Sequence, residues 1–61
     1  MEDKVRDKLR KLIDEYGVRV KFIATKLKWD YPTMIKFKNG QDNYSKRRLE
    51  QLNKFLDSYI N

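Results

Sequence analysis

The sequence has no cysteine and no histidine among its 61 residues. Without cysteine there can be no disulfide framework and no thiolate nucleophile. Without either residue the ligand set of a zinc finger is missing, and imidazole acid–base catalysis is excluded. We therefore expect neither a metal nor a cofactor.

Long apolar stretches are also lacking. No run approaches the ~20 residues that a transmembrane helix needs, and the N-terminus shows no signal-peptide pattern. A core this small can hardly enclose a ligand pocket of ~300 Å³. The expectation is one cytoplasmic domain over residues 1–61 that is no enzyme. It should bind neither a membrane nor a small-molecule ligand.

Positive charge is abundant and unevenly placed. Fifteen Lys and Arg against nine Asp and Glu give a net charge of +6. Residues 1–15 are neutral and residues 49–61 carry −1, so residues 16–48 carry +7. We call residues 16–48 the central segment; its nine bases are Arg19, Lys21, Lys26, Lys28, Lys36, Lys38, Lys46, Arg47 and Arg48. Such a segment favours a polyanionic partner such as nucleic acid.

Apolar spacing predicts two helices in the first half of the chain. The first covers about residues 2–16 and ends before Gly17, which suits a left-handed C-terminal position. The second covers about residues 19–28. The predicted inward residues are Val5, Leu9, Leu12, Ile13 and Tyr16 in the first helix, and Val20, Ile23, Ala24 and Leu27 in the second.

Two further helices are predicted in the second half. Asp30 is a favoured N-cap for a helix of about residues 31–38, which ends at Asn39-Gly40. Residues 41–44 form a polar loop, and Ser45 caps a last helix of about residues 46–59. The inward residues are Met34 and Phe37, then Leu49, Leu52, Leu56 and Tyr59. With no strand pattern, the sequence predicts an all-α domain of four helices.

Residues 20–40 resemble the helix-turn-helix of the Cro and phage-repressor type, also called XRE-like. The segment aligns over the full motif without a gap. Ala24 stands where that family has a small residue, and Asn39-Gly40 matches the end of its recognition helix. Two departures are Lys28, at a turn position usually held by Gly, and Val20, where a DNA-contacting Gln is common. The resemblance implies a compact, lambda-repressor-like four-helix domain.

The resemblance also implies which residues contact DNA. Base edges in the major groove would be read by Tyr31, Pro32, Thr33, Ile35 and Lys36. Phosphates would be bound by Arg19, Lys21, Asn39, Gln41, Lys46 and Arg47. Each basic residue has a simpler interpretation as part of a solvated surface. Trp29 corresponds to a core position, so we interpret it as packing.

The resemblance and the basic central segment together imply that the chain is nucleoid-associated and binds double-stranded DNA in a sequence-specific manner. The leading hypothesis is a small transcriptional repressor of phage or mobile-element type that acts by occupying its operator. A homodimer through Phe55, Tyr59 and Ile60 would give half-sites about one helical turn apart. Two alternatives stay open: an architectural or recombination accessory factor, and a helical protein-interaction module whose basic face meets an acidic partner.

Overall fold

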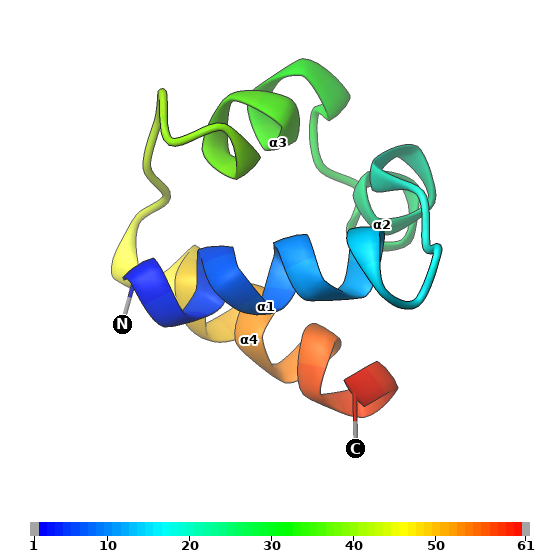
Figure 1. Ribbon diagram of the computed structural model, residues 1–61. Helices are drawn as coiled ribbons and strands as arrows, with labels where there is room; N and C mark the ends of the chain where they lie inside the picture. Colours follow the sequence, from blue (N-terminus) through cyan, green and yellow to red (C-terminus); the bar gives the residue numbers. More distant parts are fainter. Residues whose placement is uncertain (1, 61) are drawn as a thin grey trace.

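The four amphipathic segments of the sequence form four helices in the computed structural model, which describes residues 2–60 (Figure 1). They are α1 (Glu2–Asp14), α2 (Val20–Leu27), α3 (Tyr31–Lys38) and α4 (Lys46–Ile60). Within residues 2–60 there is no strand. In the same range, none of the helices has both the length and the apolar character needed to cross a membrane. The predicted all-α architecture of four helices is confirmed.

The helices pack around one core. α1 lies along α4, α3 rests on α1, and α2 packs against α3 (Figure 1). The apolar positions predicted to face inward supply nearly all of the buried side chains. These are Val5, Leu9, Leu12, Val20, Ile23, Ala24, Met34, Phe37, Leu49, Leu52 and Leu56. The folded domain measures 24 × 21 × 19 Å, and buried side chains from all four helices belong to one core cluster.

Two predicted core positions are wrong. α1 ends at Asp14, and Tyr16 beyond it is 50% exposed. The reason is that Gly17 has φ 72° and Val18 N–H donates to the Leu12 carbonyl at 3.2 Å, so the chain turns away before Tyr16 can reach the core. Tyr59 is 41% exposed because it lies in the last turn of α4, at the margin of the domain, where its ring neighbours are the exposed Phe22 and the half-buried Phe55.

α2 and α3 end in the same way with different residues. At the end of α3, Gly40 has φ 80°, and Gln41 N–H donates to the Lys36 carbonyl at 2.8 Å. At the end of α2, Lys28 has φ 60° and ψ 38°, and Trp29 N–H donates to the Ala24 carbonyl at 2.8 Å. This six-residue closure places its penultimate residue in the left-handed region, which is favourable for glycine and strained for lysine. Lys28, at the turn position usually held by Gly in the family that the segment resembles, thus has the left-handed conformation.

Candidate nucleic-acid interface

The start of α3 is fixed by a side-chain cap. Asp30 Oδ2 accepts hydrogen bonds from the Thr33 backbone N–H at 3.2 Å and from the Thr33 hydroxyl at 2.7 Å. The preceding turn is short, because only Trp29 and Asp30 separate the left-handed Lys28 from α3. Pro32 sits in the first turn, where a helix has no use for its missing N–H. The predicted N-cap role of Asp30 is confirmed.

α3 has one buried and one exposed face. Met34 and Phe37 are fully buried against the core. Three of the five residues expected to read bases are exposed: Tyr31, Pro32 and Lys36. The other two, Thr33 and Ile35, are half-buried. Ile35 packs against the core, and the Thr33 hydroxyl donates a hydrogen bond to Asp30 Oδ2.

The six residues expected to bind phosphate are all exposed and belong to the elements next to α3 in the chain. Arg19 and Lys21 lie at the start of α2, and Asn39 and Gln41 follow α3. Lys46 and Arg47 open α4. The first turn of α4 contains no acidic residue. Ser45 caps this turn weakly, with Oγ 3.4 Å from Arg48 N.

The positive charge of the central segment is not neutralised locally. In residues 2–60 the ion pairs within 4 Å involve only two bases, Arg6 and Lys8 of α1. None of the nine bases of the central segment belongs to such a pair over the same range. This leaves a cationic surface that salt or a polyanion would have to screen.

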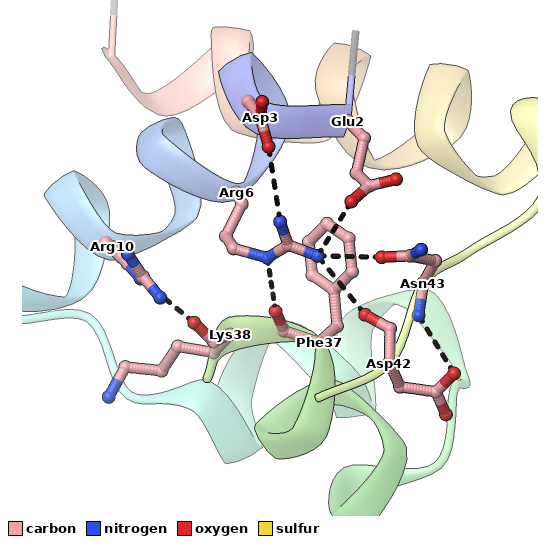
Figure 2. A network of polar contacts seen from close by, with 8 residues as sticks. All are labelled: Glu2, Asp3, Arg6, Arg10, Phe37, Lys38, Asp42 and Asn43. Atoms are coloured by element: carbon pink, nitrogen blue, oxygen red, sulfur yellow. Dashed lines mark hydrogen bonds and ion pairs between the residues drawn. The ribbon is translucent and has the colours of Figure 1, made fainter. Parts of the chain in front are cut away.

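A buried arginine of α1 that was not among the predicted site residues holds the far end of α3. Arg6 is 9% exposed, and its Nε donates to the Phe37 carbonyl at 2.7 Å (Figure 2). Its Nη2 reaches the Asp42 carbonyl at 3.2 Å and Asn43 Oδ1 at 2.9 Å, both in the loop before α4. A weak sequence signal existed, since Arg6 borders the apolar stripe three residues before Leu9.

A second arginine of α1 supports the same helix end. Arg10 Nε donates to the Lys38 carbonyl at 2.9 Å (Figure 2). The last carbonyls of a helix carry partial negative charge, so cations bind there favourably. Two guanidinium groups from α1 thus fix the carboxyl end of α3, while Asp30 fixes its amino end.

The loop before α4 is not uniformly polar as predicted, because Tyr44 is buried with 8% exposure. Its ring lies 4.9 Å from that of Trp29 and 4.8 Å from that of Phe37, and the Arg48 guanidinium lies 5.2 Å from the Trp29 ring centroid. The expected packing role of Trp29 is confirmed. Tyr44 directly precedes the Ser45 cap, a position where an apolar residue commonly packs against the new helix.

The hydroxyl of Tyr44 is buried and has no hydrogen-bond partner among the described residues. Burial raises the pKa of this phenol. The nearby Arg48 opposes that rise in pKa, while the carboxylates of Asp30 and Asp42 add to it. The ring therefore contributes packing, and the oxygen is a local cost to stability.

Exposed aromatic side chains gather where α2 meets the end of α4. Phe22 and Tyr59 are each 41% exposed and meet edge to face with ring centroids 6.3 Å apart. Phe55 is half-buried, 5.1 Å from Tyr59, and Lys26 Nζ lies 5.6 Å from the Phe22 centroid. We call Phe22, Phe55 and Tyr59 the aromatic patch. Ile60, the third residue expected at a dimer contact, is half-buried.

Residues 2–60 contain no group of three or more acidic side chains placed to hold a metal ion, and no pocket is found over this range. Comparison with protein-family models, with curated proteins and with solved structures finds no significant match to this chain. The candidate functional site of this chain is therefore the surface of α2, α3 and the start of α4.

Proposed function

We propose that this chain binds double-stranded DNA in a sequence-specific manner through a helix-turn-helix formed by α2 and α3. The observation that carries the proposal is the set of nine basic side chains of the central segment, none of them in an ion pair with another of residues 2–60, on and around a helix whose outer face is exposed. The most suitable biological role is that of a small transcriptional repressor of phage or mobile-element type. It would act by occupying an operator and excluding polymerase.

In this proposal α3 enters the major groove, which is ~12 Å wide and admits one helix. Its amino-terminal residues meet the base edges. Lys36 donates to guanine O6 or N7, Pro32 touches a thymine methyl group, and Tyr31 bonds a base or a phosphate. Ile35 would contribute only the part of its side chain that is not packed on the core.

Phosphates are bound at the helix ends around α3. Arg19 and Lys21 supply cations and backbone N–H groups at the start of α2, and Lys46 and Arg47 do so at the start of α4. The three basic residues in the first turn of α4 are unfavourably placed relative to the helix dipole, and a bound phosphate would offset that local cost. Asn39 and Gln41 bond phosphate through their side-chain amides.

The salt dependence of duplex binding tests this proposal. Log K should fall linearly with log salt between about 50 and 200 mM, with a slope of about −0.9 for each phosphate contacted. Lys46→Gln should reduce the slope by about one unit. Lys54→Gln removes an exposed lysine from the same helix outside the central segment and should leave the slope unchanged. No duplex binding at low salt, or equal effects of both variants, contradicts the proposal.

We further propose a homodimer through the aromatic patch together with Ile60. Support comes from the two exposed rings of Phe22 and Tyr59, and from the near-neutral charge of residues 49–61 compared with the central segment. A strongly basic chain approaches its own copy most easily where its charge is low. Sedimentation equilibrium should give a dimer for the native chain and a monomer for Tyr59→Gln. A monomer in both cases at all accessible concentrations rejects this contact.

A further inference from the structure

The hydrogen bond between Asp30 and Thr33 has a fixed direction. A carboxylate at neutral pH has no proton to give, so the hydrogen in the 2.7 Å contact belongs to the Thr33 hydroxyl. The Thr33 oxygen then keeps only lone pairs for a further partner. Among the described residues nothing donates to Asp30 Oδ1, and Asp30 is exposed. Together the two side chains offer acceptors and no donor.

The charge of Asp30 is unusual for its place. The central segment has only two acids, Asp30 and Asp42, against nine bases. Asp42 lies in the loop after α3, where its Oδ1 accepts from the Asn43 N–H at 2.8 Å. Asp30 lies at the amino end of α3, where its charge repels phosphate. Serine or asparagine would cap the helix equally well. A negative acceptor at this end therefore suits a partner that carries hydrogen-bond donors.

We propose that Asp30 and Thr33 read one exocyclic amino group in the major groove, either cytosine N4 or adenine N6. This inference rests on the proposed DNA binding and adds a specificity determinant to it. Only these two amino groups are donors on the major-groove edges, whereas guanine O6 and N7 and thymine O4 are acceptors. The pair excludes guanine and thymine at the same position, because two acceptors facing each other share no hydrogen.

Asp30→Asn tests directly whether a hydrogen-bond acceptor at this position selects the base. The asparagine carbonyl can keep the cap on Thr33 N–H while its amide presents a donor. In binding-site selection from a random duplex pool, one position should change from cytosine or adenine to guanine or thymine. The relative affinity for the two classes of base should move by roughly 5- to 150-fold. Thr33→Val should weaken the native preference at that position without reversing it.

Asp42→Asn is the matched control, since it removes the same charge from the other acid of the central segment. Both Asp→Asn variants should bind nonspecific duplexes more tightly, but only Asp30→Asn should change the selected base. Asp30→Ser is a second variant for the case that Asp30→Asn lowers the unfolding temperature. Serine keeps the cap without a charge, and Asp30→Ser should abolish the preference at that position.

Three results separate the inference from the proposed function. A reversed base at one position for Asp30→Asn alone supports the inference. If Asp30→Asn and Asp30→Ser both select the same sequence as the native chain, the inference is overturned and the proposed DNA binding stays intact. A native chain that selects no sequence at all overturns the proposed function, and the reading of an amino group with it.

Discussion

Arg6 contacts Phe37 in two ways, because its Nε donates to the Phe37 carbonyl at 2.7 Å and its guanidinium lies 4.7 Å from the centroid of the Phe37 ring (Figure 2). One side chain of α1 thereby holds both the backbone end and a core ring of α3. Through Asp42 and Asn43 it also ties down the loop that leads to α4. The orientation of α3 is set from α1, a helix outside the basic segment.

Arg6→Met should destabilise the fold much more than Arg10→Met. Each residue donates Nε to a carbonyl at the end of α3, but only Arg6 is buried and makes several such bonds. Losing hydrogen bonds from a buried charged group should lower the free energy of unfolding by about 2 kcal/mol or more, against less than about 1 kcal/mol for Arg10→Met. Urea titrations measure both values. Equal losses would contradict the clamp role of Arg6.

Lys28→Gly should stabilise the protein by about 0.5–1 kcal/mol, because glycine adopts φ 60° without steric cost. Gly40→Ala is the reciprocal change at the end of α3. A Cβ at position 40 has none of the described atoms within 4 Å. The expected loss of about 1 kcal/mol in the free energy of unfolding therefore comes from the left-handed backbone conformation alone. Thermal unfolding detects both shifts. A lower unfolding temperature for Lys28→Gly would show that Lys28 makes a contact that outweighs the strain.

Tyr44→Phe should raise the free energy of unfolding at neutral pH by about 1 kcal/mol. The change keeps the ring between Trp29 and Phe37 and removes a buried hydroxyl that has no partner. Chemical denaturation of the two proteins measures the difference. A marked loss of stability would mean that the hydroxyl makes a stabilising hydrogen bond in solution.

The same substitution should alter the dependence of stability on alkaline pH. The folded state raises the pKa of Tyr44 above its unfolded value of about 10. The unfolded chain therefore loses this proton first as the pH rises, so the native protein keeps its full free energy of unfolding below about pH 10 and becomes less stable above it. The advantage of Tyr44→Phe should widen between pH 9 and 11. A constant gap would show that burial does not perturb this phenol.

Lys36→Ala and Arg47→Ala should have different effects on DNA binding. Lys36 lies on the exposed face of α3, so its loss should cost about 1–3 kcal/mol on the best site and relax the preference at one base. Arg47 lies on the first turn of α4 and should weaken all duplexes alike. Competition titrations with specific and unrelated duplexes separate the two patterns. Equal losses on every duplex for both variants would remove Lys36 from the set of base-reading residues.

Most of the fold follows from local signals in the sequence. The apolar spacing identifies the four helices and their buried faces, and Asp30 and Ser45 mark two of the starts. The resemblance places Lys28 at a turn position usually held by Gly, which left open a left-handed residue or an altered turn, and its φ of 60° is left-handed. These features depend on neighbours within a few residues, which a sequence displays directly.

Long-range contacts could not be predicted in the same way. Arg6 and Phe37 are 31 positions apart, and the place of Arg6 beside the apolar stripe of α1 is only a weak local signal that does not identify this partner. The sequence around Tyr44 predicts only a polar loop. The burial of Tyr44 depends on Trp29 and Phe37, which lie elsewhere in the chain. Tyr16 was wrongly placed in the core because the spacing of apolar residues continues beyond the point where the backbone turns. Most residues expected to contact DNA lie on the surface, where the fold does not require their identity, so their role stays a prediction.

Binding-site selection from a random duplex pool at about 0.15 M salt tests the central claim most directly, because nonspecific phosphate attraction is already weakened there. The account predicts an enriched motif, and a two-fold symmetric motif if the aromatic patch forms a dimer. A pool that shows no enrichment after repeated selection would contradict base reading by α3. The basic surface would then have to be explained by an acidic protein partner.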